Sequence, residues 1–457
     1  MTGLNSDSIS KQVRLAQPEL LEELKTLIAQ PSISATGEGI EECAILVQDV
    51  MRRSGITTEI LRISGAPPLV YGRVDSKSNP DKTLLFYNHY DVQPPEPLDL
   101  WDDPPFGGTI RDGKIFGRGA SDDKGELMTR IKAVKSYMDV YGDVPCNILF
   151  VVEGEEEIGS VNMARYLKEY TDRLRCDGVI WEFGYVDVQD RPIISLGMKG
   201  LLYLELTCKK LATDAHSSLA TIMENPAWRL IQALDGMRDA NGNVTIPDWH
   251  REKRPLSDMD RQIIEESAFD ADAYRSEFGI DKLLTGSDDI DAKTALATGT
   301  TCNIAGFYSG HGGAGVKTVL PASATAKVDF RLVPDMDPAK QLERLKEYLH
   351  ERGFDDIQVK NLGPVAPHRT DPSNQLVDIT RSAARESFGD AVLSISSAGT
   401  GPMHAFSSIL EAPCISVGAT YVFARIHSPN EFARLDLLEK ATTCMCKIMD
   451  RFGKRPS

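Results

Sequence analysis

Apolar and polar positions alternate between helical and strand-like spacing along the first part of the chain. Apolar side chains recur every three or four residues in the helical segments, and short β-branched or aromatic runs separate them. The helical segments are 9–30, 38–54, 127–141 and 158–170. The strand-like segments are 69–74, 83–87, 115–116, 147–152 and 179–181. Alternation of strand and helix predicts an α/β unit with a mainly parallel sheet.

After Gly200 the order of elements changes to strand, helix, strand, strand, helix, strand. This order is that of a small α+β open sandwich. The predicted elements are 201–210, 226–237, 301–307, 325–332, 338–351 and 357–359. The polar stretch 239–298 interrupts them and is expected to be helical in parts, around 258–271. A helix over 375–387 and a closing helix then return the chain to the first unit.

The length of 457 residues also favours two domains, because single hydrophobic cores rarely grow so large. We expect residues 1–199 and 365–457 to form one domain and residues 200–364 to form an insertion in it.

Composition narrows the possible partners and the compartment. The net charge of −16 argues against a nucleic-acid partner. No apolar run has the length of a membrane span, and the N-terminal residues have no secretory apolar core. The eight cysteines are scattered, which favours reduced, mostly buried thiols and a cytoplasmic protein.

Polar side chains follow three of the apolar runs, where an α/β fold presents ligands at the carboxyl ends of its strands. These polar segments are N-H-Y-D at 88–91, S-D-D at 121–123 and E-G-E-E-E at 153–157. An imidazole and several carboxylates suit one or two divalent ions such as Zn²⁺ or Mn²⁺.

Each segment alone also has an ordinary explanation. His89 can be a turn histidine, Asp122 and Asp123 can cap a helix, and the acidic run can be a solvated turn. The buried-type strand before the acidic run, and the close backbone approach indicated by Gly117 and Gly119, favour a bound cation.

A collinear series of motifs gives these residues a specific context. The motifs are HYDVQP, WDDPPF, GRGASDDKG, GEEEIGS, DAHSS, RLVPDMDP, GTGPM and IHSPNE. Together they resemble the dinuclear-metal peptidase and deacylase family. This family includes carnosinase-type dipeptidases, acetylornithine deacetylase, succinyl-diaminopimelate desuccinylase and glutamate carboxypeptidases. The form of the first two motifs is most similar to the carnosinase and cytosolic non-specific dipeptidase branch.

The resemblance implies two divalent metal ions, with Zn²⁺ as the first expectation and Mn²⁺ or Co²⁺ as alternatives. The implied metal ligands are His89, Asp122, Glu157, Glu182 and His427. Asp122 matches the carboxylate that bridges both ions. Asp123 matches the neighbour joined to it by a cis peptide bond and is the alternative bridging residue.

The resemblance also implies catalytic roles for Glu156, Asp91 and His216. Glu156 matches the general base, and Asp91 matches the residue that orients His89. His216 matches the histidine that stabilises the oxyanion, usually in the site of a partner subunit. From its local sequence alone, His216 is a surface-loop histidine.

Substrate contacts follow from the same motifs. Arg331 matches a residue that binds the substrate carboxylate, although it can equally pair with a strand aspartate. Further candidate contacts are Asn303, Gly399, Thr400, Gly401 and His368.

These observations predict a catalytic domain with an inserted lid and dimerisation domain. The expected activity is hydrolysis of dipeptides or short peptides by a metal-bridged hydroxide, with Glu156 as general base. One alternative is an N-acyl amino acid deacylase with the same mechanism, and another is a non-catalytic relative that binds peptide or metal. The expected assembly is a homodimer formed through the lid domain, without a nucleic-acid or membrane partner.

Overall fold

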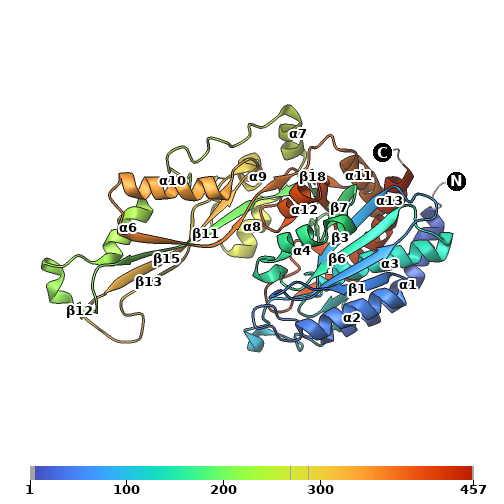
Figure 1. The fold of residues 1–457 in the computed structure, drawn as a ribbon, viewed down its shortest axis with the longest axis horizontal. Helices are drawn as coiled ribbons and strands as arrows, with labels where there is room; N and C mark the ends of the chain where they lie inside the picture. Colours follow the sequence, from blue (N-terminus) through green and yellow to red (C-terminus); the bar gives the residue numbers. More distant parts are fainter. Residues whose placement is uncertain (1–5, 268, 287, 455–457) are drawn as a thin grey trace.

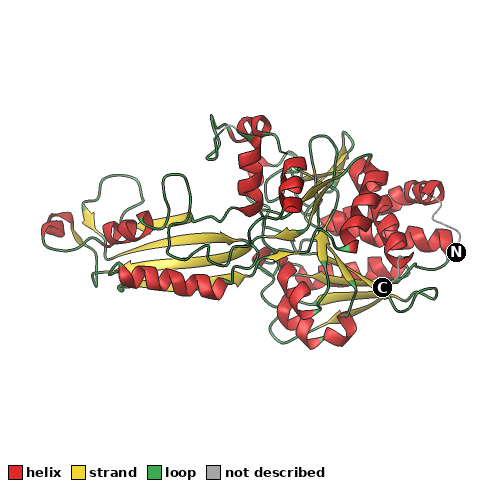
Figure 2. Cartoon of the chain, turned by 90° about the horizontal axis from the view of Figure 1, so that it is seen from above, coloured by secondary structure: helices red, strands yellow, loops and turns green. Residues whose placement is uncertain are grey.

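The computed structural model describes residues 6–267, 269–286 and 288–454. Residues 1–5 and 455–457, at the ends of the predicted first domain, lie outside the described residues, as do residues 268 and 287. The chain forms an elongated molecule with two parts (Figure 1). One part carries both termini, and the other consists mainly of long strands with helices beside them (Figures 1 and 2).

The first part is built on an eight-stranded sheet of order β1-β2-β6-β3-β7-β19-β9-β18. Its central strands β6, β3 and β7 are parallel neighbours, whereas β1 and β2 at one side pair antiparallel. Every residue of β6 is buried, as expected for a strand covered on both faces. The strands are β1 (Thr57–Leu61), β2 (Leu69–Val74), β3 (Thr83–His89), β6 (Asn147–Glu153), β7 (Gly178–Trp181), β9 (Ile193–Ser195), β18 (Val392–Ser394) and β19 (Cys414–Ser416).

Helices cover both faces of this sheet. One core contains residues of α1, α2, α3, α11 and α13, and a second core on the opposite face contains residues of α4 and α12. The helices are α1 (Ser6–Ala29), α2 (Ile40–Arg53), α3 (Lys124–Tyr141), α4 (Met163–Glu169), α11 (Gln375–Phe388), α12 (Met403–Ile409) and α13 (Leu435–Lys454). The predicted α/β class with a mainly parallel sheet is confirmed.

The second part is an antiparallel sheet of order β13-β15-β11-β16. Buried and less buried residues alternate along β11 and β15, so each strand turns one face to a separate core with α6 and α10. The elements are β11 (Gly200–Lys209), α6 (Pro226–Asp235), β13 (Asn303–Ser309), β15 (Ser323–Leu332), α10 (Pro338–Glu351) and β16 (Ile357–Val365). The predicted open sandwich is confirmed, and β16 is longer than predicted.

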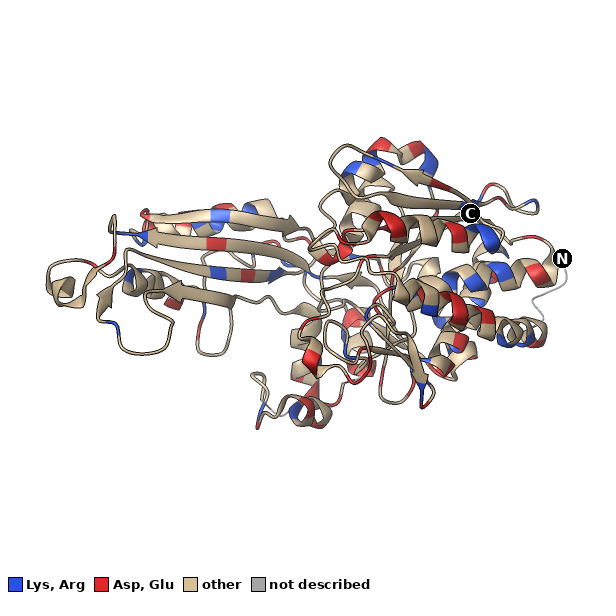
Figure 3. Ribbon diagram, turned by 90° about the horizontal axis from the view of Figure 1, so that it is seen from below, with Lys and Arg blue, Asp and Glu red and all other residues tan. Residues whose placement is uncertain are grey.

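The two parts are joined where β10 (Gly197–Met198) pairs antiparallel with β17 (His368–Arg369). The predicted domain boundaries at 200 and 364 lie close to this pair and remain predictions. Acidic and basic residues are interspersed over both parts (Figure 3). Within the described ranges, we find no helix with the length and apolar character needed to cross a membrane.

The described residues between 239 and 298 form three helices, where the sequence predicted one around 258–271. These are α7 (Asp258–Glu266), α8 (Ala271–Phe278) and α9 (Asp289–Thr298). The prediction of a partly helical stretch is confirmed, but the helix that begins at Asp258 ends before residue 271. Ser267 is extended, and Asp270 begins a new helix by accepting a hydrogen bond from the Ala273 amide. Helix α7 contacts α9 and also β18 of the first part, so this segment lies against both parts of the molecule.

The helix predicted over 158–170 is also shorter in the structure. A 3-10 turn spans Glu156–Ile158, and α4 begins only at Met163. Gly159 and Ser160 have φ values of 96° and 49°, which interrupt a right-handed helix. Glu156 begins the 3-10 turn, shortly after the end of β6.

Candidate metal centre

The predicted ligands come from neighbouring strand ends and two loops. His89 is the last residue of β3, Glu157 follows β6 and Glu182 follows β7. Because β3, β6 and β7 are parallel neighbours, these side chains leave the sheet at the same edge. Asp122 lies just before α3, and His427 lies in the loop between β20 (Thr420–Tyr421) and β21 (Phe432–Arg434).

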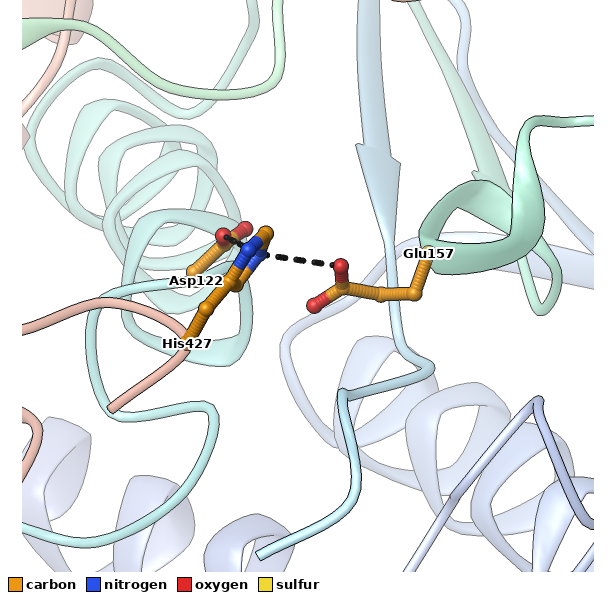
Figure 4. A group of neighbouring side chains, drawn as sticks. All are labelled: Asp122, Glu157 and His427. Atoms are coloured by element: carbon orange, nitrogen blue, oxygen red, sulfur yellow. Dashed lines mark hydrogen bonds and ion pairs between the residues drawn. The ribbon is translucent and has the colours of Figure 1, made fainter. Parts of the chain in front are cut away.

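Asp122 lies at the centre of the group. Its Oδ1 is 3.0 Å from His89 Nε2, and its Oδ2 is 3.1 Å from His427 Nε2. His427 Nε2 is also 3.0 Å from Glu157 Oε2 (Figure 4). The two oxygens of Asp122 therefore face different imidazoles, which is the arrangement of a carboxylate that could bridge two ions.

Two buried carboxylate oxygens point to a cation as the missing partner. Glu182 Oε1 accepts a hydrogen bond of 3.0 Å from Trp181 Nε1, and Glu182 Oε2 is 3.9 Å from His89 Nε2. Among the described residues, Glu182 Oε2 and Glu157 Oε1 have no hydrogen-bond partner. An unsatisfied buried acceptor costs about 1–3 kcal/mol, more when charged, so such oxygens fit metal ligands.

The donor set thus fits two divalent ions that share Asp122. His89 and Glu182 would complete one site, and Glu157 and His427 would complete the other. Imidazole nitrogens with carboxylate oxygens suit Zn²⁺, Mn²⁺ or Co²⁺ better than Ca²⁺, which prefers oxygen ligands alone.

Asp91 holds His89 and the acidic turn in position. His89 Nδ1 is 3.0 Å from the backbone oxygen of Asp91 and 3.4 Å from its carboxylate. These acceptors hold the proton on Nδ1 and leave Nε2 free to bind a metal. The same carboxylate accepts hydrogen bonds from the amides of Glu156 and Glu157, at 3.1 and 3.0 Å. Asp91 therefore orients both the histidine and the acidic turn, and the sequence indicated only the first role.

Asp123 supports the group rather than pointing into it. The peptide bond between Asp122 and Asp123 is cis, as the resemblance implies. Asp123 Oδ2 accepts hydrogen bonds from Asn88 Nδ2 at 2.7 Å and from the His89 amide at 3.0 Å. Of the two candidate bridging carboxylates, the geometry therefore favours Asp122.

The crowded carboxylates repel one another strongly. Burial raises the pKa values of Glu156 and Glu182 well above the usual range, and neighbouring acidic side chains raise them further. Hydrogen bonds to Asp122 and Glu157 raise the pKa of His427 to about 10. Divalent ions would reverse these effects, because a bound cation favours the ionised carboxylates and displaces the imidazole proton.

His427 also has an unusual backbone. Its φ is 60°, in the left-handed region, where a non-glycine residue costs about 1–3 kcal/mol. The surrounding loop holds His427 in this conformation, which directs its ring to Asp122.

Glu431 is a positioning residue that the sequence prediction missed. Its buried carboxylate pairs with Arg118 Nη1 at 2.7 Å. It also accepts hydrogen bonds from the amides of Ser121 at 3.0 Å and Asp122 at 3.1 Å. The signal was available, because Glu431 ends the motif that contains His427, but its role depends on a loop more than 300 positions away.

Replacing Glu431 by Gln is expected to lower the free energy of unfolding by about 3 kcal/mol, because it leaves Arg118 buried without its counter-charge. Urea unfolding of the purified variant would measure this loss. The matched change at the exposed Glu277 should alter stability by less than about 0.5 kcal/mol. Equal stability of the two variants would contradict the positioning role.

His216 lies away from this centre within the chain. It is exposed on β12 (Ala215–His216), at the end of the molecule opposite the first part (Figure 1). Its ring contacts Ser218 Oγ at 2.9 Å and Thr318 Oγ1 at 3.3 Å. The structure therefore does not bring His216 to the metal ligands of its own chain.

The candidate substrate contacts fall into two groups. Arg331 Nη1 donates to Thr400 Oγ1 at 2.5 Å, and Thr400 Oγ1 donates to the Lys199 carbonyl at 2.8 Å. The loop Gly399–Gly401 thus meets the second sheet at the junction. Half-buried His368 also lies at the junction, on β17, whereas exposed Asn303 on β13 donates to Asp329 at 2.7 Å.

The chain is similar to known proteins in sequence and in fold. The model of the family described as peptidase family M20/M25/M40 matches residues 85–451. A rat protein named β-Ala-His dipeptidase is 26% identical over 75% of this chain and 73% of its own length. A structure described as the M20 family metallo-carboxypeptidase Sso-CP2 from Sulfolobus solfataricus matches with a TM-score of 0.91 and 36% identity. That match covers 95% of this chain and 99% of the other. The structure of the dipeptidase Dug1p from Saccharomyces cerevisiae has a TM-score of 0.86 at 22% identity, covering 99% of each chain, and shows similarity of fold.

Proposed function

Because this chain belongs to peptidase family M20/M25/M40, we propose that it hydrolyses dipeptides and other short peptides with two bound divalent ions. The observation that supports this most directly is the position of Asp122 between His89 and His427, beside carboxylate oxygens without partners. The names of two similar proteins support the same activity. The rat relative is named as a dipeptidase, and the Sulfolobus structure is described as a metallo-carboxypeptidase.

The metal ions, when bound, would polarise the scissile carbonyl and lower the pKa of an attacking water. Glu156 takes the proton from that water and delivers it to the leaving amine. Glu156 suits this role because it follows β6 in the same turn as Glu157, with its amide held by Asp91. Arg331 binds the substrate carboxylate and thereby orients the amide bond.

We also propose that two copies of the chain associate through the second sheet. Strand β13 is an edge strand, and its side chains Ile304, Phe307 and Tyr308 are exposed. An exposed apolar edge strand is a template for pairing with a second copy. Such a dimer would give His216 a role in the partner's metal centre, where it would stabilise the oxyanion. The eight free cysteines suit a cytoplasmic location.

Metal removal tests the proposed activity. We expect chelation to reduce hydrolysis of a dipeptide panel to background and reconstitution with Zn²⁺, Mn²⁺ or Co²⁺ to restore it, because the ions activate both water and carbonyl. A parallel panel of N-acetyl amino acids would distinguish a deacylase with the same mechanism. A folded, metal-loaded protein without turnover on either panel would contradict the proposal and favour a non-catalytic binding protein.

A further inference from the structure

Residues 239–298 form one wall of a cavity of about 620 Å³, which we call the insertion pocket. The other wall comes from the second sheet and from the junction, with Asp329 and Arg331 on β15, Lys199 beside β11 and Ala398. A volume of this size is typical of a small-molecule site. The segment to which the sequence assigned no role therefore shapes a cavity at the junction of the two parts.

The wall formed by residues 239–298 is mainly apolar. Its large side chains are Phe269, Tyr274, Leu283, Leu284 and Leu296. Tyr274, Leu284 and Leu296 are 36%, 66% and 41% exposed, and the rings of Phe269 and Tyr274 stack at 4.9 Å. Apolar side chains gathered in a concave surface and left open to solvent are typical of a binding site.

Cationic groups lie at the opposite side of the pocket. Lys199 is only 3% exposed, and its ammonium donates to the carbonyls of Ala295 and Gly299 at 3.3 and 2.6 Å. Burial and the nearby charge of Arg331 lower the pKa of Lys199 to about 8. Within the described residues, no ion pair joins Lys199 or Arg331 to a carboxylate. These cations therefore suit an anionic group of a ligand.

A series of contacts connects this side of the pocket to the metal centre. Arg331 binds Thr400, and the next residue, Gly401, packs so closely on Trp181 that an added Cβ would lie 3.1 Å from its ring. Trp181 immediately precedes the ligand Glu182 and binds its carboxylate.

We propose that the insertion pocket binds a large apolar side chain, aromatic or aliphatic, of the C-terminal residue of the substrate. The inference rests on the proposed function, because it takes the substrate carboxylate to lie at Arg331. The carboxylate and side chain of that residue branch from one α-carbon, so a carboxylate at Arg331 directs the side chain into the adjoining pocket. The wall of residues 239–298 then selects peptides that end in Phe, Leu or a similar residue.

Hydrolysis of Gly-Phe and Gly-Gly by the metal-loaded full-length protein tests this proposal. Tyr274→Ala is expected to lower kcat/KM for Gly-Phe about 10-fold and to change the value for Gly-Gly less than about 2-fold, because only Gly-Phe uses the apolar wall. Ala295→Phe, which fills the pocket instead of enlarging it, should produce the same selective loss. Met259→Ala, an exposed change on α7 outside the pocket, should leave both values unchanged.

The possible outcomes distinguish a failure of the proposed pocket from a failure of the proposed peptidase activity. Equal losses on the two substrates, or no loss for Gly-Phe with either pocket variant, would overturn the inference while leaving the peptidase proposal intact. Failure of the wild-type protein to hydrolyse either peptide would overturn the inference, and the wider dipeptide and N-acetyl amino acid panels would then decide the proposed function. A selective loss in both pocket variants, with Met259→Ala unchanged, would support the pocket as the site of specificity.

Discussion

Replacing Glu156 by Gln is expected to lower kcat for dipeptide hydrolysis by about 10²–10⁴-fold, the usual contribution of a general base. The amide of Gln has nearly the same shape but cannot accept the proton of the attacking water. Metal content should stay the same, because the proposed ligands are other residues. Steady-state kinetics and metal analysis of the purified variant would measure both quantities.

Glu155 provides a matched control from the same acidic run. Its carboxylate accepts hydrogen bonds from the Asn162 amide at 2.7 Å and from Asn162 Nδ2 at 3.0 Å. Glu155→Gln should therefore affect the local turn and leave kcat within about 10-fold of the wild-type value. A Glu156→Gln variant with wild-type kcat, or one that loses its metal, would rule out the proposed role of Glu156.

A heterodimer of a His216→Ala chain and a Glu156→Gln chain is expected to regain about half of the wild-type kcat per dimer, although each variant alone is nearly inactive. The physical reason is the position of His216 on β12, away from the metal ligands of its own chain. If each centre receives His216 from its partner, one of the two centres has both Glu156 and His216. Two affinity tags on co-expressed chains would isolate this heterodimer for kinetics.

The complementary heterodimer is the control. It pairs a wild-type chain with a chain that carries both His216→Ala and Glu156→Gln. If His216 acts in the partner's centre, neither centre is complete and the activity should be near background. Activity in this second heterodimer and none in the first would show that His216 acts within its own chain. A monomeric protein with full activity would contradict the dimer proposal.

Local patterns in the sequence were sufficient for much of the fold. Strand β2 has the bounds that its apolar run predicted, and α10 spans the predicted residues 338–351. The alternating pattern of β11 likewise predicted a strand with one covered face. These predictions succeeded because burial of a periodic apolar face is determined within one element.

Predictions failed where local backbone conformation or distant contacts intervene. The left-handed Gly159 and Ser160 shortened the helix predicted over 158–170. In 239–298 the weak apolar pattern did not separate α7 from α8, and the cap at Asp270 decided the boundary. Short helices within a polar stretch show too little hydrophobic periodicity for their boundaries to be predicted.

The sequence by itself determined the chemical types of side chain that meet at the candidate metal centre. Apolar runs followed by His89, Asp122 and Glu157 predicted an imidazole and carboxylates at neighbouring strand ends, because parallel strands bring their carboxyl ends to one edge of the sheet. It also predicted an α/β unit with an α+β open sandwich inserted in it. These features follow from the order of residues along single elements.

Only the tertiary structure decided how distant segments combine. It turned Asp122 rather than Asp123 toward both histidines, placed Glu431 under the Asp122 loop and moved His216 away from its own centre. It also closed residues 239–298 against the second sheet to form the insertion pocket. Such arrangements depend on packing and hydrogen bonds between residues far apart in the chain, and no local pattern of side chains specifies them.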